Sequence, residues 1–292
     1  MLKVLEGLGD SVPIPRRCYM FYRDGILVRS HIFDGFSICH GFSGKAGGVS
    51  THPHTASLNL AMGREDSDDV VRQNIDIFVK AVTGGIFGKE HAVCAPQIHS
   101  AIVRKVGRSD WGSGVMFPSP AEGDGFVTDE PGVFIFVRIA DCTPILLCGK
   151  KEDGRPVIAA VHAGWRGTAK GIAPEAVCAM VSLGCVKDSI RAAVGPHIGA
   201  CCYEVGGDLF DEVKSLRGTD FAEKFVTPSP AVHGKYSCDM SGMNRALLLD
   251  AGVSEKSIDI SPDCTYCMSD MYYSHRKTAG RRGAMGAGIV IV

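Results

Sequence analysis

The sequence predicts a mixed α/β fold in which helices cover layers of β-sheet within one domain. Strand-like apolar runs and amphipathic helical segments follow one another without the strict βαβ period of a doubly wound sheet. The chain has 292 residues, 45% of them hydrophobic, and is therefore long enough to bury a large core. No internal repeat and no long linker rich in Pro, Ser or Gly divides it, so we expect a single domain over residues 1–292.

The N-terminal third is expected to hold a hairpin, a loop and a helix. Asp24-Gly25 lies between two strand-like runs in "CYMFYRDGILVRSHIF" and is typical of a hairpin turn. The glycine-rich stretch "HGFSGKAGGVSTHPHTASLNLAMG", residues 40–63, predicts a loop. Ser67 is a candidate N-cap for a helix whose buried face is predicted by apolar residues at helical spacing, namely Val71, Ile75, Phe78 and Val82.

The rest of the chain is expected to mix strands with three further helices. Pro174 suits a first helical turn and Gly184 a helix end, which predicts a helix near 174–183. Helices are also expected near 207–216 and 241–251, the second capped by Ser241. The expected strands lie in residues 91–106, 125–129, 133–139, 144–148, 157–162, 190–199, "SIDISPDC" and "AMGAGIVIV".

Charge and composition exclude several classes of protein. The chain carries 31 basic and 32 acidic residues and no block of either sign, so neither nucleic acid nor a membrane surface is expected as a partner. It has no apolar stretch of about 18 residues that would span a membrane. The N-terminal "MLKVLEGLGDSVPIPRRC" lacks the apolar core of a secretory signal, so we expect a cytoplasmic protein, either monomer or homodimer. Its 12 cysteines are expected to be reduced and mostly packed as small hydrophobic residues.

Three polar residues stand in apolar surroundings: His99 in "APQIHSAIV", Cys142 in "IADCTPILLCG" and His162 in "VIAAVHAGWRG". Two imidazoles and one thiolate are a favourable ligand set for Zn²⁺, and three protein ligands leave a fourth position open, as in catalytic zinc sites. The residue types fit two other hypotheses equally well, a Cys142–His162 nucleophile pair and ordinary core packing. Sequence spacing alone does not separate these three.

Other motifs are less specific. "FSGKAGGVS" offers backbone amides to an anion but lacks the spacing of a P-loop, so a plain loop is the simpler interpretation. Cys264 and Cys267 have C-x-x-C spacing, but with no second pair in view we expect neither metal nor redox chemistry there. The basic residues Arg166, Arg276 and Arg281 are candidates for phosphate, whereas Lys277 and Arg282 are expected to be ordinary surface residues.

Eight ordered segments resemble one family across residues 36–292. They are "HGFSGKAGGVS", "SLNLAMG", "PQIHSAIV", "GDGFVTDEPG", "ADCTPILL", "VHAGWRGTAKGI", "GPHIGACCYEV" and "CTYC" through "YYSHRKTAGR". The family is YfiH/DUF152, also called the polyphenol oxidase or laccase-domain family, whose members are regarded as purine nucleoside phosphorylases. The resemblance implies a layered α-β-β-α sandwich, with residues 1–35 as an N-terminal hairpin extension of the family core.

The resemblance also implies a function. Family members are described as cleaving adenosine, inosine, guanosine and 5′-methylthioadenosine with phosphate to the base and a pentose 1-phosphate, and adenosine deamination has been attributed to them. Their zinc ligands correspond here to His99, Cys142 and His162. For this chemistry we expect Arg166, Lys45 and Arg281 to contact phosphate. We further expect Asp141 to move protons or orient a ligand, Asn59 to contact the nucleoside, and Tyr203 to stack on or cap it.

The chain departs from the family pattern at several anion-binding positions. Gly44-Lys45 replaces the usual Thr-Arg, "SHRK" at 274–277 replaces an aromatic residue with paired arginines, and Ala279 replaces a threonine. Lysine keeps the charge of arginine but loses its bidentate fork. Two alternative enzymes remain open: a Cys142–His162 hydrolase or deamidase, and a copper-dependent phenol oxidase with extra ligands from His40, His52, His54 and His197. A non-enzymatic protein with a structural metal is less favoured, because three ligands are too few.

Overall fold

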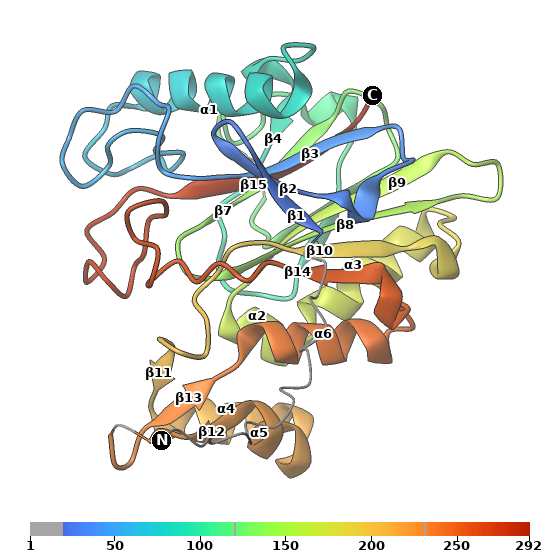
Figure 1. The fold of residues 1–292 in the computed structure, drawn as a ribbon. Helices are drawn as coiled ribbons and strands as arrows, with labels where there is room; N and C mark the ends of the chain where they lie inside the picture. Colours follow the sequence, from blue (N-terminus) through green and yellow to red (C-terminus); the bar gives the residue numbers. More distant parts are fainter. Residues whose placement is uncertain (1–19, 120, 231) are drawn as a thin grey trace, which may run out of the picture.

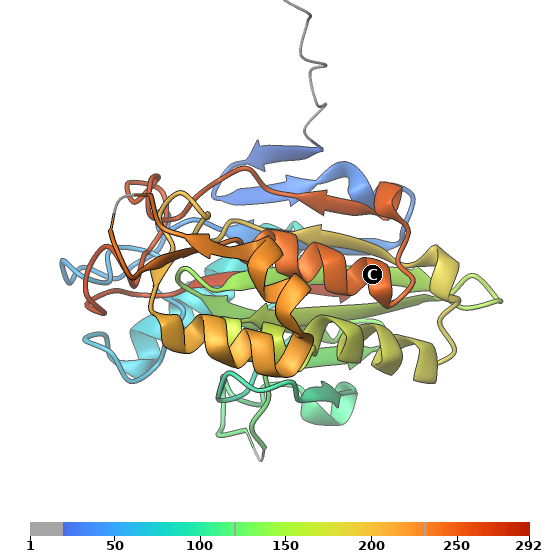
Figure 2. The same ribbon diagram turned by 90° about the horizontal axis from the view of Figure 1, so that it is seen from below.

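The computed structural model describes residues 20–292 apart from residues 120 and 231. Segment 1–19, on which the expectation about a secretory signal was based, lies outside the described residues. Two six-stranded sheets pack face to face, with helices on both outer faces (Figures 1 and 2). This is the α-β-β-α arrangement that we predicted. None of the described helices is long and apolar enough to cross a membrane.

Sheet A has the strand order β1-β2-β3-β15-β7-β4. It begins with the hairpin predicted from Asp24-Gly25 and continues through antiparallel pairs as far as β7, on which the short β4 lies parallel. Its strands are β1 (Phe21–Asp24), β2 (Leu27–Ser30), β3 (Ile38–Ser43), β15 (Met285–Ile291), β7 (Phe134–Ile139) and β4 (Ala92–Val93). The outer face is covered by α1 (Asp68–Thr83), whose Val71, Ile75, Phe78 and Val82 are buried and whose N-cap is Ser67, as predicted.

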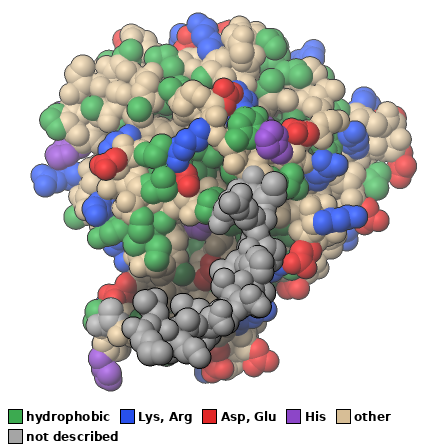
Figure 3. Space-filling model, in the orientation of Figure 1, with side chains coloured by type: hydrophobic (Ala, Val, Ile, Leu, Met, Phe, Trp, Pro, Cys, Tyr) green, Lys and Arg blue, Asp and Glu red, His purple; other side chains and the backbone are tan. Residues whose placement is uncertain are grey.

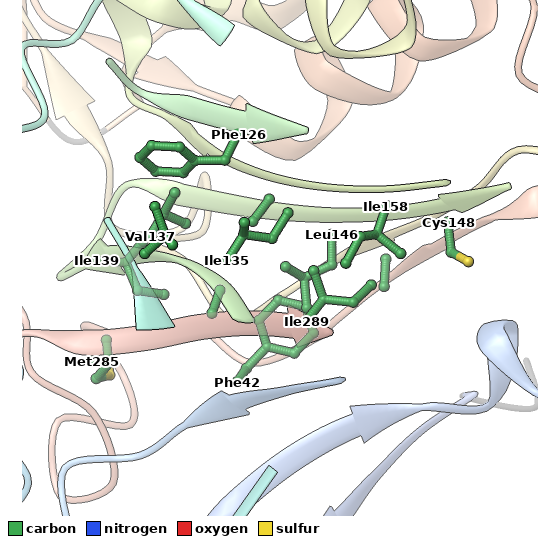
Figure 4. Packing of buried hydrophobic residues seen from close by; sticks show 14 of the residues in the cluster. Phe42, Phe126, Ile135, Val137, Ile139, Leu146, Cys148, Ile158, Met285 and Ile289 are labelled. Atoms are coloured by element: carbon green, nitrogen blue, oxygen red, sulfur yellow. The ribbon is translucent and has the colours of Figure 1, made fainter. Parts of the chain in front are cut away.

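Sheet B has the strand order β14-β10-β8-β9-β6-β5. Its strands are β14 (Ile258–Ile260), β10 (Arg191–Val194), β8 (Thr143–Lys150), β9 (Pro156–Ala163), β6 (Gly125–Thr128) and β5 (Val103–Lys105). The outer face is covered by α3 (Ile172–Ser182) and α6 (Met240–Asp250). Side chains from the two inner faces form the central core, as Figure 4 shows for Phe42, Ile135, Leu146, Ile158 and Ile289.

A smaller region lies beyond α6 at the lower edge of Figure 1. It contains a three-stranded sheet and two helices that pack with α2 around Val213, Phe225 and Met243. Its elements are β11 (Glu204–Val205), β13 (Tyr236–Cys238), β12 (Val226–Pro228), α4 (Gly207–Arg217) and α5 (Thr219–Phe225), and α2 covers Trp165–Lys170. Of these, only the helix near 207–216 was predicted, because the others are too short to show a clear period.

Three element boundaries differ from the predictions. The expected strand over 91–106 is interrupted, because residues 94–102 form a loop between β4 and β5 in which His99 has a positive φ of 58°. The loop expected at 40–63 starts later, since β3 continues to Ser43. The N-cap of α6 is Asp239 rather than Ser241: the Asp239 carboxylate accepts the Gly242 N–H at 2.8 Å.

Candidate metal centre and its surroundings

The three predicted ligands lie together at one end of sheet B. His99, Cys142 and His162 place their ligand atoms within 4.8 Å of one another, and Cys142 Sγ lies 3.9 Å from His99 Nε2. The pairing of β8 with β9 explains this, because Thr143 is paired with Ala163 in an antiparallel register. The residue just before β8 and the residue near the end of β9 therefore meet, and His99 reaches them from the loop before β5. Loops and strand ends of this kind commonly present reactive groups on a rigid scaffold.

A fourth residue, Asp124, organises the two histidines, and the sequence analysis missed it. Its carboxylate is fully buried and accepts a hydrogen bond from His162 Nδ1 at 2.9 Å. It also accepts the backbone N–H groups of residues 98, 99 and 100 and the Ser100 hydroxyl. These bonds fold the His99 loop around the carboxylate and leave His162 Nε2 facing Cys142. The available signal was an aspartate between two glycines directly before a buried strand, in "GDGFV".

The charges of the centre support one another. Burial raises the pKa of the Cys142 thiol, but His162 and His99 outweigh it and lower that pKa to about 6. Burial lowers the pKa of His162, but Cys142 and Asp124 raise it to about 9. Burial likewise raises the pKa of Asp124, while hydrogen bonds from His162 and Ser100 bring it down to about 2. Near neutral pH the sulfur is therefore a thiolate, the form that binds soft metals.

The residues at this centre fit a zinc ion. Two imidazoles and a thiolate are borderline-soft donors of the type that zinc prefers, and the oriented His162 ring has a carboxylate behind it, as metal-bound histidines usually do. Space is kept open by Gly164, since a Cβ atom there would lie 2.6 Å from His99 Cδ2 and 3.4 Å from Cys142 Sγ. Three protein ligands leave a coordination position for water or substrate.

Asp141 fixes the wall beside Cys142. Its carboxylate is nearly buried and accepts the Thr265 hydroxyl at 2.7 Å, the Ser274 hydroxyl at 3.0 Å and the Arg276 backbone N–H at 2.7 Å. With three donors in place, this carboxylate orients residues 265–276 rather than a metal-ligand side chain. Its predicted role in proton movement or ligand orientation stays a prediction.

Aromatic and basic side chains border the centre on one side. Tyr203, Trp165 and Arg276 line a cavity of about 390 Å³. The Arg276 guanidinium lies over the Tyr203 ring at 5.2 Å and donates to the Glu204 carbonyl. Burial, followed by the Cys142 charge, raises the pKa of the Tyr203 hydroxyl. The predicted phosphate ligand Arg166 is exposed and stacks on Trp165 at 4.1 Å.

Lys45 and Arg281 meet at a second, smaller cavity of about 100 Å³, together with Arg282. Lys45 Nζ donates to the Ser269 carbonyl at 2.6 Å, and Arg281 is exposed. A Cβ atom on Gly44 would lie 3.0 Å from the Met271 carbonyl oxygen, which is a tight contact.

Arg282 corrects the sequence analysis, which assigned it to the surface. It is half-buried, and its Nε is buried without a hydrogen-bond partner. Burial and the nearby Arg64 lower its pKa, whereas the charges of Cys142 and Asp141 raise it. A buried N–H without a partner is rare and marks a place where an anion would be favourable. Lys277, by contrast, is exposed as expected.

Two sets of predicted residues do not face the centre. Asn59 is fully buried, and its amide bonds Ala61, Asp66 and Ala284, which leaves no free group for a nucleoside. The histidines considered as extra copper ligands also lie apart, since within residues 20–292 the groups suited to a metal contain none of them. His40 accepts the Ser30 N–H inside sheet A, His197 bonds the Gly195 carbonyl, and the His52 and His54 rings lie against each other at a tilt of 56°.

The C-x-x-C segment also needs correction, because a second cysteine pair does accompany it. Cys201 and Cys202 lie against Cys264 and Cys267, with all four sulfurs within 4.8 Å of one another. Sequence separation concealed this pair. The described cysteines are free of disulfides.

Comparison with known proteins identifies the family. Residues 39–292 match the family model described as multi-copper polyphenol oxidoreductase laccase. The chain belongs to this family. The laccase-like family also contains the solved structure of YfiH from Bacillus licheniformis, to which the chain is similar with a TM-score of 0.83 and 29% identity, over 93% of this chain and 99% of that one. The YlmD structure from Geobacillus stearothermophilus is similar with a TM-score of 0.80 and 32% identity, over 94% and 99% of the two chains.

Curated members of the laccase-like family carry names of nucleoside enzymes. The chain is 36% identical to purine nucleoside phosphorylase YlmD of G. stearothermophilus over 84% of this chain and 87% of the relative. It is 30% identical to human purine nucleoside phosphorylase LACC1, over 86% of this chain and 54% of that longer protein. It is also 36% identical to adenosine deaminase RL5, from an unknown prokaryotic organism, over 57% and 60% of the two chains.

Proposed function

We propose that this protein is a zinc-dependent purine nucleoside phosphorylase with adenosine deaminase activity at the same centre. Its substrates would be adenosine, inosine, guanosine and 5′-methylthioadenosine with phosphate, and its products the base and a pentose 1-phosphate. The observation that carries this proposal is the His99–Cys142–His162 group, held by Asp124 and bordered by aromatic and arginine side chains. The names of the relatives supply the reaction.

Phosphorolysis requires a site for an anion close to the sugar and a place for the purine. We assign the anion to Arg282, whose buried Nε has no partner, with Lys45 and Arg281 at the same cavity. Tyr203 and Trp165 offer ring surfaces on which a purine can stack, and Arg276 lies beside them to oppose negative charge on the departing base. Arg166 takes a secondary place because its guanidinium is exposed and stacked on Trp165.

His99, Cys142 and His162 would hold the zinc ion, which supplies Lewis-acid chemistry for both reactions when bound. The protein's own part is to keep the ligand set rigid. Asp124 holds the proton on His162 Nδ1, so that Nε2 faces Cys142 and is the atom that gives up its proton to bind a metal. Asp141 keeps residues 265–276 against the centre and thereby holds Arg276 beside Tyr203.

The test is to incubate metal-quantified protein with adenosine, with and without phosphate, and to separate the products by chromatography. Phosphate-dependent adenine demonstrates phosphorolysis, and inosine formed without phosphate demonstrates deamination. His162→Ala should abolish both and lose the zinc ion of this centre, whereas His233→Ala, which alters an exposed loop histidine, should change neither. Full turnover by the His162→Ala protein, or no product from zinc-loaded wild type, would contradict the proposal.

A second candidate function is a cysteine hydrolase or deamidase. In such an enzyme Asp124 would orient His162, and His162 would be the base that activates the nucleophile Cys142. The lowered pKa of Cys142 suits a reactive thiolate. The two functions differ in their response to zinc. If zinc is the native cofactor, it should protect Cys142 from iodoacetamide, with the modified residue located by peptide mass spectrometry. Equal alkylation with and without zinc would favour the hydrolase.

A further inference from the structure

A group of four cysteines lies apart from the proposed reaction centre. It consists of Cys201, Cys202, Cys264 and Cys267, hereafter the four-cysteine cluster. Cys201 and Cys202 follow β10, and Cys264 and Cys267 follow β14. These strands are parallel neighbours in sheet B, with Val194 paired to Ile260. Their carboxyl ends therefore meet at one edge of the sheet, and this brings together two cysteine pairs more than 60 residues apart in the sequence.

The sulfur positions match a single tetrahedral metal ion. Four thiolates at about 2.3 Å from a zinc ion lie about 3.8 Å from one another, by the geometry of a tetrahedron. In the four-cysteine cluster, Cys201 Sγ lies 3.8 Å and Cys202 Sγ lies 3.3 Å from Cys267 Sγ, and no pair exceeds 4.8 Å. Iron–sulfur clusters hold their cysteines further apart, because several metal atoms lie between them.

The backbone around Cys264 is arranged to receive a thiolate. The Gly199 N–H donates to Cys264 Sγ at 3.2 Å. Donors of this kind offset the charge of a metal-bound thiolate. Gly199 can approach so closely because it has no side chain: a Cβ atom there would lie 3.2 Å from Cys201 Sγ and 3.6 Å from Cys264 Sγ.

We propose that the four-cysteine cluster binds a zinc ion as a structural site that joins the loops after β10 and β14. Four protein ligands saturate tetrahedral zinc, so this ion would have no position for substrate. The site also supports the reaction centre, because Thr265 follows Cys264 and donates to Asp141, the residue before Cys142. The same loops meet Asp141 again where Ile198 donates to its carbonyl oxygen at 2.9 Å.

The side of the cluster that faces solvent is open. Cys201 and Cys267 are exposed, and Cys201 and Cys202 line a cavity of about 700 Å³ with Tyr266 and Arg276. A chelator should therefore reach this ion in the folded protein, and thiol reagents should react with Cys201 and Cys267 only after the ion is removed.

The experiment is to measure metals in full-length protein produced with added zinc and purified without chelator. Wild type should contain two zinc ions per chain. Cys267→Ser and His162→Ala should each contain one, and the double variant none. Cys178→Ser, which changes an exposed cysteine on α3, should keep both. Wild type with one zinc ion that His162→Ala loses would overturn the proposal.

Cobalt substitution gives a readout that does not depend on the folding of Cys267→Ser. In His162→Ala protein reloaded with Co²⁺, the four-cysteine cluster should give strong thiolate-to-cobalt charge-transfer bands and the visible bands of tetrahedral cobalt. Absence of these bands would overturn the proposal. So would iron with acid-labile sulfide, or an intact mass two hydrogens lower from a disulfide. Because this variant lacks the reaction centre, the result is independent of the proposed enzyme activity.

Discussion

The two thiolate groups of this protein are built from similar atoms for different ends. The reaction centre contains one cysteine and two histidines, and the buried carboxylate of Asp124 orients them. The four-cysteine cluster has no histidine, and the Gly199 N–H takes the place of a carboxylate. Three ligands leave a metal reactive, whereas four ligands make it a cross-link. The comparison teaches that the number of ligands and the groups behind them, rather than the presence of cysteine, separate chemistry from architecture.

The largest expected effect comes from removing the carboxylate of the reaction centre. Asp124→Ala would leave buried donors of residues 98–100 and His162 without their acceptor, and we expect a loss of about 3–5 kcal/mol in the free energy of unfolding. Urea unfolding of zinc-free protein measures it. Ser100→Ala removes one of these donors and should cost about 1 kcal/mol. Similar losses for the two variants would show that Asp124 does not organise the centre.

The next prediction tests whether the buried Arg282 guanidinium binds the phosphate of the reaction centre. Arg282→Ala should raise the KM for phosphate about 10–100-fold, because a charged hydrogen bond of about 1.5–3 kcal/mol is lost. Arg281→Ala, at an exposed neighbour, should change this KM less than about threefold. Zinc content should remain at the wild-type level in both. If Arg281 proves the more important residue, our assignment of the buried guanidinium is wrong.

A matched pair of glycine substitutions probes the two groups separately. Gly164→Ala would push a Cβ atom to 2.6 Å from the His99 ring, and such overpacking costs about 1–3 kcal/mol, so zinc affinity at the reaction centre should fall about 5- to 150-fold. Gly199→Ala makes looser contacts with Cys201 and Cys264 and should weaken only the four-cysteine cluster, by less. Competition with a chromogenic chelator distinguishes the sites. Loss of both ions in either variant would show that the two groups are not independent.

The smallest effect concerns the acid response of the fold itself, which has to be separated from metal release. Burial, and then the charge of Arg29, lower the pKa of His40 from 6.5 to about 3. As the pH falls below 6.5 the unfolded chain takes up this proton and the folded chain does not, so stability falls by about 1.4 kcal/mol at pH 5.5. Glutamine does not titrate in this range. The free energy of unfolding of zinc-free His40→Gln protein should therefore decrease by about 1.4 kcal/mol less than that of wild type between pH 7.5 and 5.5. If the unfolding free energies of the two proteins depend equally on pH, His40 does not cause the acid response.

Sequence patterns were sufficient where a single element carried the information. The period of Val71, Ile75, Phe78 and Val82 predicted α1, and the Asp24-Gly25 turn predicted the first hairpin. They failed where distant segments meet. Asp124 and Arg282 acquire their roles from partners that sequence spacing does not reveal, and the Cys201–Cys202 pair becomes visible beside Cys264 only through the pairing of β10 with β14. The resemblance to the laccase-domain family singled out His99, Cys142 and His162 as metal ligands, which residue types alone left open, and the structure brings these three residues together.

The position of β15 has a consequence for the synthesis of the protein. This strand is the last in the chain, yet it lies in the middle of sheet A between β3 and β7. Until residues 285–291 have left the ribosome, sheet A consists of two separate halves, and the core residues that Figure 4 shows around Ile289 face an unfilled space. Sheet B, complete by residue 260, can form earlier. Folding of the sandwich is thus expected to finish only after translation of this segment, with strand edges exposed to chaperones or aggregation in the meantime. On the face that Figure 3 shows, basic and acidic side chains of the folded protein are interspersed.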